Sequence, residues 1–243
     1  MTVRIVDVGD EASLALIPPC ADARFDHRTC DYLEEADRGS KASRPAWLEP
    51  VPVTRAAAPA LADNPFAPPP RVTPSNPFAA GDDEGDAPDN PFAPRVQRER
   101  PLRVGVPRKL ALLDRGRGIF GSYAKVLLID EDAVAYCQFG PLSAYPRASR
   151  LRELYPQLPQ SPLPAVITCI ATTADARRAG HARRLVEDVC RDLTDRGFSA
   201  VEAYPDLTLA EAEASAAGPG FWHELGFATA VDDERYPVMR REL

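Results

Sequence analysis

Residues 165–186 read AVITCIATTADARRAGHARRLV. The first seven residues are apolar and rich in β-branched side chains, which predicts a strand buried on both faces. From residue 181 to residue 196 the apolar positions recur at steps of three and four, which predicts an amphipathic helix packed on a sheet. The turn between them holds Gly180 with two arginines on each side. This stretch therefore predicts strand, turn and helix, with positive charge concentrated where the helix begins.

The predicted turn has the features of an anion site. A helix N-terminus offers unpaired N–H groups and the positive end of the helix dipole, and arginines add bidentate donors suited to phosphate. Gly180 lets the backbone approach a ligand closely, so a pyrophosphate is the expected guest. No Lys or Ser/Thr follows Gly180 as GxxxxGK[ST] requires, and the single glycine does not satisfy GxGxxG. The remaining pattern is R-x-x-G-x-A, formed by Arg177, Gly180 and Ala182.

A second motif lies downstream of this turn. Residues 221–227 read FWHELGF, which predicts a short helix ended by Gly226 and then a strand. A helix and a strand, predicted over 200–204, separate the two motifs. In this order they resemble the coenzyme A signature and the C-terminal FYEKLGF-like element of the GNAT N-acetyltransferase superfamily. The resemblance is clearest over residues 120–243.

The resemblance implies a fold, a co-substrate and the residues that bind it. The fold would be mixed α/β, a splayed mixed sheet flanked by helices, with acetyl-CoA bound between the splayed strands and no metal. Backbone groups of Cys169, Ile170 and Ala171 would hold the pantetheine arm like an added strand, and the Ile170 N–H would polarise the thioester carbonyl. The pyrophosphate would be held by Arg177, Arg178, Ala179, Gly180, His181, Ala182 and Arg183.

The resemblance also implies direct attack of a neutral amine on the thioester, helped by a base and an acid. In many members the acid is a tyrosine of the FYEKLGF-like element. Here that position is Trp222, whose indole N–H is a donor only. Glu202 is a candidate base or a solvated carboxylate on a strand face, and Tyr204 is a candidate acid or a packing residue.

Other side chains leave alternatives open. Tyr136 can be a catalytic substitute or a core residue, and His223 adjoins Trp222 but is expected to face another way. Cys169 can be an acylated nucleophile or a small buried hydrophobe. A metal site at Cys20, His27 and Cys30 is weighed against an ordinary loop with two cysteines, and the loop is favoured. The odd number of five cysteines, without CxxC, argues against a disulfide framework.

Composition divides the chain into three parts. Residues 50–107 hold about half of the 26 prolines and no apolar periodicity, which predicts a disordered insertion. Residues 1–49 and 108–243 are expected to form one acyltransferase domain, the second part being the coenzyme-binding core. The insertion contains NPF at 64–66, 76–78 and 90–92. These repeats either dock a protein partner, as NPF ligands of EH domains do, or are a repeated spacer.

Further elements are expected outside the motif region. Strands are predicted at 3–8, 227–231 and 236–240, a hairpin at 124–130 and 133–139, short helices within 31–47 and over 108–114, and a loop at 141–164. The loops at 20–48 and 141–164 are expected to line the acceptor entrance. Their acidic residues would attract a cationic amine or form a solvated face: Asp31, Glu34, Glu35 and Asp37.

Charge and hydropathy limit the class of protein. The net charge of -7 argues against a nucleic-acid partner. No apolar run reaches the roughly 20 residues of a membrane span, and no secretory leader is visible, so a cytoplasmic protein is expected. The leading interpretation is an acetyl-CoA-dependent N-acyltransferase acting on an amine. The alternatives are a non-catalytic acyl-CoA-binding module that docks a partner through its NPF repeats, and a nucleotide-binding protein.

Overall fold

The computed structural model describes residues 2–20, 23–51, 104–207 and 217–243. These residues belong to one compact unit, Met1–Pro52 together with Leu102–Leu243. A second unit, Val53–Pro101, lies outside the described residues, and so do the NPF repeats and nearly all of the predicted insertion. Among the described residues, no helix is both long and apolar enough to cross a membrane.

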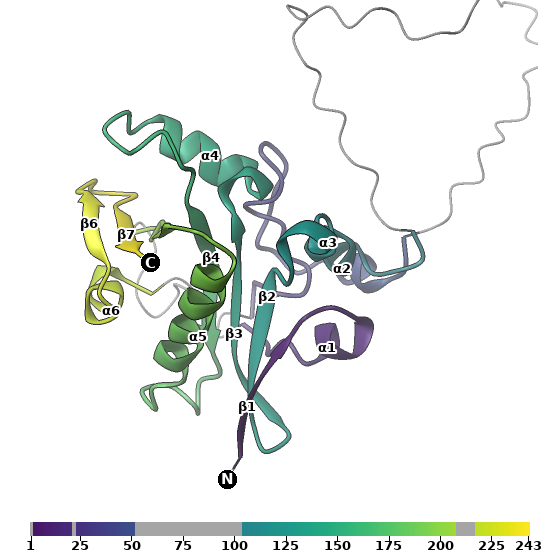
Figure 1. Ribbon diagram of the computed structural model, residues 1–243. Helices are drawn as coiled ribbons and strands as arrows, with labels where there is room; N and C mark the ends of the chain where they lie inside the picture. The colour runs from purple at the N-terminus through teal and green to yellow at the C-terminus, as the bar shows by residue number, and fades with distance from the viewer. Residues whose placement is uncertain (1, 21–22, 52–103, 208–216) are drawn as a thin grey trace, which may run out of the picture. The chain divides into compact units, whose positions relative to one another are not determined.

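A seven-stranded mixed sheet forms the centre of the described unit (Figure 1). Its strand order is β1-β2-β3-β4-β5-β7-β6, and every neighbouring pair is antiparallel except β4 and β5. The strands are β1 Val3–Asp7, β2 Ala124–Ile129, β3 Asp132–Pro141, β4 Ala165–Thr172, β5 Ala200–Ala203, β6 Ala228–Val231 and β7 Val238–Glu242. The mixed α/β fold is thereby confirmed.

Helices cover both faces of this sheet. They are α1 Glu11–Ala15, α2 Arg108–Leu113, α3 Arg117–Phe120, α4 Pro146–Glu153, α5 His181–Asp195 and α6 Pro219–Glu224, with 3-10 turns η1 Pro45–Leu48 and η2 Leu142–Ala144. The buried face of α5, which includes Leu185 and Val189, packs on Cys137 and Ile167. Leu14 of α1 and Leu110 of α2 pack on the opposite face. Figure 1 shows α5 beside β3 and β4, and α1 to α3 grouped beside β2.

Strands β4 and β5 separate soon after they meet. Only Ala165–Ile167 of β4 pair with Val201–Ala203 of β5. From Cys169 to Thr172, β4 continues to pair with β3, but no described strand pairs with the other edge of β4 after Ile167. The predicted splayed sheet is therefore present, and its open edge exposes backbone donors and acceptors.

A β-bulge at Thr168 sets the direction of the side chains that follow. Gln138 lies opposite Cys169 and Phe139 lies opposite Ile167, so Thr168 is the extra residue. Ile167 packs with the α5 core, whereas Cys169 packs against the core on the other face. Without the bulge, the two-residue period of a strand would turn Cys169 toward α5.

Most predicted elements are found close to their predicted positions, but two predictions are wrong. Residues 31–47 contain turns and end in η1, with no α-helix. The predicted loop 141–164 contains η2 and α4. Helix α4 lacks an apolar stripe, because its two buried residues are Ala148 and Arg152, and periodicity could not reveal it. Helices α1 and α3 were not predicted, since each is one turn long or little more.

The described residues on either side of segment 52–103 are hydrogen-bonded to each other. The Val51 N–H donates to the Val106 carbonyl at 2.8 Å, and the Gly105 N–H donates to the Val51 carbonyl at 2.9 Å. Pro50 and Pro107 form an isolated bridge beside them. These contacts join the two ends of the intervening segment.

Candidate active site

A cavity of about 230 Å³ lies where β4 leaves β5. Its floor includes Gln138 of β3 and Ile167, Thr168 and Cys169 of β4. Residues 25–44, which we call the roof segment, cross over it and contribute lining residues between Phe25 and Lys41. Helix α4 and the residues after β5 close the sides. The cavity is therefore built from parts of the chain that are far apart in the sequence.

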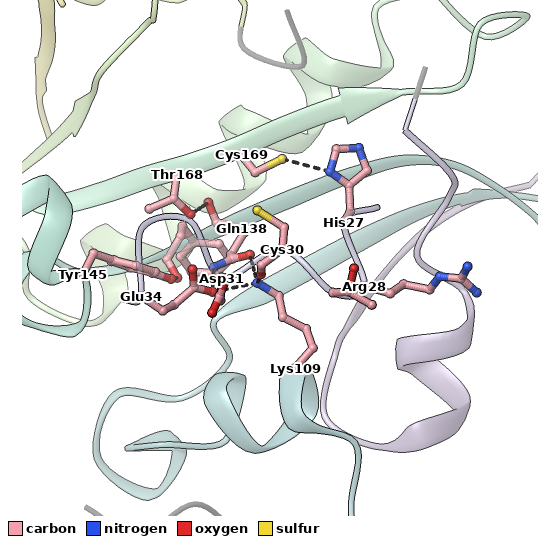
Figure 2. Close-up of polar contacts among 12 residues, drawn as sticks. His27, Arg28, Cys30, Asp31, Glu34, Lys109, Gln138, Tyr145, Thr168 and Cys169 are labelled. Carbon is pink, nitrogen blue, oxygen red and sulfur yellow. Dashed lines mark hydrogen bonds and ion pairs between the residues drawn. The ribbon is translucent and has the colours of Figure 1, made fainter. Parts of the chain in front are cut away.

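His27 of the roof segment is buried beside Cys169. Only 4% of its surface is exposed, and Nδ1 lies 3.4 Å from the Cys169 Sγ. Its Nε2 is buried and has no hydrogen-bond partner. Burial, and after it the positive charge of Lys109, lowers the pKa of His27 to about 4, so the imidazole is neutral near pH 7. Figure 2 shows the ring directed at the sulfur.

Lys109 of α2 anchors the roof segment to the floor (Figure 2). Its fully buried ammonium donates to the Cys30 carbonyl, to Glu34 Oε1 at 2.6 Å and to Gln138 Oε1 at 2.7 Å. Gln138 Nε2 also donates to Glu34 Oε1 at 2.7 Å. Burial is the largest single influence and would lower the pKa of Lys109, but the neighbouring groups together, Glu34 first among them, raise the net pKa. The lysine therefore stays charged.

Glu202 is not a solvated carboxylate, and its contacts also argue against a role as base. It has no exposed surface. Arg152 Nε donates to Oε2 at 3.0 Å, and Arg240 Nη1 donates to Oε1 at 2.8 Å. The Tyr204 hydroxyl donates to Oε2 at 2.6 Å. The carboxylate, paired with two guanidinium groups, holds α4, β5 and β7 together, and both of its oxygens are already occupied by donors.

Tyr204 lines the cavity but is poorly suited to be an acid. Burial, together with the negative charge of Glu202, raises its pKa. Its proton is already donated to Glu202. Tyr136 is fully buried and donates to Gln138 Oε1 at 3.0 Å, and burial raises its pKa as well. Both tyrosines therefore act as neutral hydrogen-bond donors here.

Trp222 lies in the core. It is 3% exposed, its Nε1 donates to the Ala217 carbonyl at 2.9 Å, and its ring packs edge-on against Phe221 and Phe227. Its only donor is occupied and it does not line the cavity, so these contacts give no support to the prediction that it takes part in catalysis. His223 faces elsewhere, as expected, with its ring nitrogens near the Phe227 carbonyl and the Thr229 hydroxyl.

The turn before α5 is open to solvent. Arg177, Arg178, Ala179 and Gly180 are all exposed, and Arg178 and Gly180 have positive φ, 62° and 80°. No side chain caps the first turn of α5, and no acidic residue lies there. His181 and Ala182 are half-buried at the start of the helix. These features keep the N-terminal amides available for an anion.

Arg183 differs from the two arginines of the turn. Its Nη2 lies 2.8 Å from Glu224 Oε2, and its Nη1 donates to the Glu224 carbonyl. It therefore connects α5 to α6 and is already paired. Arg177 and Arg178 are the arginines best placed to receive a ligand.

The predicted metal alternative finds no support in the described residues. No group of three or more His, Cys, Asp or Glu side chains there is arranged to hold a metal ion. His27 contacts Cys169 from the distant strand β4.

Burial raises the pKa of Cys169, so its thiol stays protonated, which argues against a nucleophilic thiolate.

The sequence alone did not reveal His27 as a cavity residue or Lys109 as its anchor. Both depend on contacts over a long sequence separation, such as the 142 residues between His27 and Cys169. A lysine at the start of a short helix reads as a solvated charge, and only its complete burial shows otherwise.

A scan against protein-family models and a search of the curated proteins find no match. Among solved structures, the chain is similar to the PaiA N-acetyltransferase of Thermoplasma acidophilum in complex with coenzyme A, with 9% identity, 56% of this chain and 70% of that chain covered, and a TM-score of 0.39. A Desulfovibrio desulfuricans protein described as a GNAT-family acetyltransferase is 17% identical, with 55% of this chain and 78% of that chain covered and a TM-score of 0.38. The ribosomal-protein-S18-alanine N-acetyltransferase of Escherichia coli is 16% identical, with 49% of this chain and 66% of that chain covered and a TM-score of 0.31. All three of these solved structures are described as acetyltransferases, and the second is described as a member of the GNAT family.

Proposed function

We propose that this protein is an acetyl-CoA-dependent N-acetyltransferase whose chemistry takes place in the cavity between β4 and the roof segment. The open edge of β4 from Thr168 to Thr172 carries the proposal. It begins at the cavity and ends at the turn before α5, a span of roughly 13 Å at the rise of an extended strand. An extended arm paired with this edge would have its thioester at the cavity and its pyrophosphate at the turn.

The turn and the strand would divide the binding of the coenzyme. Arg177, Arg178 and the first amides of α5 would hold the pyrophosphate, because they combine charge with unpaired N–H groups. Backbone groups of Cys169 to Ala171 would pair with the pantetheine amides. The Ile170 N–H would stabilise the negative charge that develops on the thioester oxygen.

His27 would be the base of the reaction. It is neutral near pH 7, lines the cavity and carries an unpartnered Nε2. In the tautomer that carries its proton on Nδ1, toward the Cys169 sulfur, Nε2 would have the free lone pair. An amine attacks the thioester carbon, the C–S bond breaks, and Nε2 takes the amine proton. The imidazolium then returns this proton to the coenzyme A thiolate, which completes the exchange of amine and thioester for amide and thiol.

Ligand-induced stabilisation and thiol release test the proposal. Acetyl-CoA should raise the melting temperature of the full chain, because a ligand that binds the native state stabilises it. ATP and NAD at the same concentration should not. Incubation with acetyl-CoA and a broad panel of amines should release free thiol only when an amine acceptor is present. An unchanged melting temperature with saturating acetyl-CoA would contradict binding of the coenzyme. A raised melting temperature without thiol release over the whole panel would indicate a protein that binds acetyl-CoA without catalysing transfer.

A further inference from the structure

We infer that the acceptor amine carries an anionic group, a carboxylate or a phosphate, and that Lys41 and Arg147 bind this group at the cavity. The inference rests on the proposed acetyl transfer and adds the class of the acceptor. Both side chains line the cavity, Lys41 from the roof segment and Arg147 from α4. Both are half-buried.

The two cations lie against the same ring. The Arg147 Cζ lies 4.1 Å from the ring centroid of Tyr32, and the Lys41 Nζ lies 4.9 Å from it. The Arg147 Nε is buried without a hydrogen-bond partner. Two cations held around one aromatic ring repel each other, and an anion between them would relieve this repulsion.

The nearby carboxylates are occupied by other cations. Apart from Asp26, the four acidic residues of the roof segment each have a basic partner, so they offer no free negative charge to a cationic acceptor. The ion pairs are Asp31–Arg44, Glu34–Lys109 at 2.6 Å, Glu35–Arg108 at 2.7 Å and Asp37–Arg150 at 2.6 Å. The pKa of Asp37 is lowered first by Arg150, and Arg147 contributes less.

Two other carboxylates, Asp26 and Asp206, also line the cavity. Asp26 pairs with Arg28 at 3.3 Å. Asp206 lies near Tyr236, where burial and then the Asp206 charge raise the pKa of the phenol. Lys41 also acts on the reacting end of the cavity, because its charge opposes the effect of burial on the pKa of Cys169. Lys41 and Arg147 line the same cavity as His27 and Cys169, so an anion bound by them would lie in the cavity of the proposed transfer.

The volume suits a small acceptor. About 230 Å³ accommodates a molecule of amino-acid size together with the acetyl group. An arginine can bind a carboxylate or a phosphate with two parallel hydrogen bonds, and the lysine adds a point charge. The shared requirement is an anionic group at one end and a primary amine at the other.

Matched acceptors test the inference in the full chain with acetyl-CoA. The panel pairs glycine, L-alanine and L-leucine with their carboxamides, and O-phosphoethanolamine with ethanolamine. We expect kcat/KM for the anionic member of at least one pair to exceed that of its neutral partner by about tenfold or more, mainly through KM. Preference in the amino-acid pairs would identify a carboxylate, and preference in the ethanolamine pair a phosphate.

Variants connect the preference to the two side chains. Lys41→Gln combined with Arg147→Gln should reduce the preference to about threefold or less. Arg150→Gln, on the same helix but paired with Asp37, should preserve it. The rise in melting temperature with acetyl-CoA should remain in all variants, which confirms their folding. Equal turnover of each pair, turnover of neutral amines alone, no turnover of any anionic member, or an unchanged preference in the double variant would overturn the inference. Loss of both the acetyl-CoA shift and thiol release in the unmodified chain would instead overturn the proposed function.

Discussion

The Nδ1 atom of His27 lies 3.4 Å from the Sγ atom of Cys169, although 142 residues separate them in the chain. The bulge at Thr168 makes this contact possible, because it turns Cys169 toward the roof segment. Lys109 holds the roof segment in place through the Cys30 carbonyl and Glu34. The contact thus fixes a neutral imidazole at the point where the open edge of β4 begins.

The first prediction concerns His27 as the base. His27→Gln should lower kcat by about 100-fold, since general base catalysis contributes that much or more. The rise in melting temperature with acetyl-CoA should persist, because the imidazole does not contact the pyrophosphate turn. His223→Gln is the matched control, since His223 lies outside the cavity lining and contacts Phe227 and Thr229. Thiol release measures the effect, and an unaltered kcat in His27→Gln would exclude this base.

The second prediction distinguishes direct transfer of the acetyl group to the amine from transfer through an acetylated Cys169. Cys169→Ser should retain activity within about tenfold, since a thiol whose pKa burial has raised is not ionised near pH 7 and is not needed as a nucleophile. Mass spectrometry after rapid mixing with acetyl-CoA should show no acetyl group on the unmodified protein. An acetylated Cys169, together with an inactive serine variant, would contradict direct transfer.

A third prediction follows from the depressed pKa of His27. In the unfolded chain its pKa is near 6.5, and in the folded chain it is about 4. Below pH 6.5 the unfolded state binds a proton that the folded state does not, so stability falls as pH decreases from 6.5 toward 4. The full effect is roughly 3 kcal/mol, and it is absent above pH 7.

Urea unfolding as a function of pH measures this effect, and His27→Gln should flatten the stability between pH 4 and pH 6.5. The groups facing the imidazole are Lys109, Asp26, Cys169 and Tyr136. Asp26 is the one carboxylate among them, and Asp26→Asn serves as the control for its charge. The same pH dependence in the glutamine variant would assign it to other groups.

The fourth prediction concerns the anion turn. Arg177→Ala combined with Arg178→Ala should abolish the thermal shift with acetyl-CoA, and so should Gly180→Glu. The glutamate would place negative charge at the helix N-terminus and a side chain on a backbone with φ of 80°. Arg184→Ala is the control, because Arg184 is exposed one turn further along α5. An unchanged rise in melting temperature in the double alanine variant would show that the turn before α5 does not bind the pyrophosphate.

The strand, turn and helix over residues 165–195 were predictable because their signals are local. Apolar β-branched residues predict β4, and steps of three and four predict α5. The order of the two motifs also indicated the splayed sheet. The bulge at Thr168 was not predictable, since no glycine or proline marks it and the pairing with β3 alone defines it.

The catalytic side of the site was predictable to a much smaller extent. Glu202 reads as one residue of a short strand, and the sequence does not show that Arg152 and Arg240 neutralise it from two other elements. Trp222 occupies the position of an acid in the resembled motif, but its contacts with Phe221 and Phe227 make it a core residue. His27 could be placed only once the irregular roof segment was located over β4. Local sequence patterns therefore indicated the candidate coenzyme-binding residues, whereas the candidate catalytic residues are brought together by contacts between distant parts of the chain.

The final prediction concerns the segment between the two parts of the described unit. Deletion of residues 55–100 should leave folding and acetyl-CoA binding intact. The hydrogen bonds between Val51 and residues 105 and 106 bring the ends together, so the residues left between them can close as a short loop. Circular dichroism, urea unfolding and the acetyl-CoA thermal shift should agree with those of the full chain. A matched control replaces Val51 with proline in the shortened chain, which removes the donor to Val106 and should destabilise it. Aggregation or loss of the shift on deletion alone would show that the compact unit requires residues 55–100.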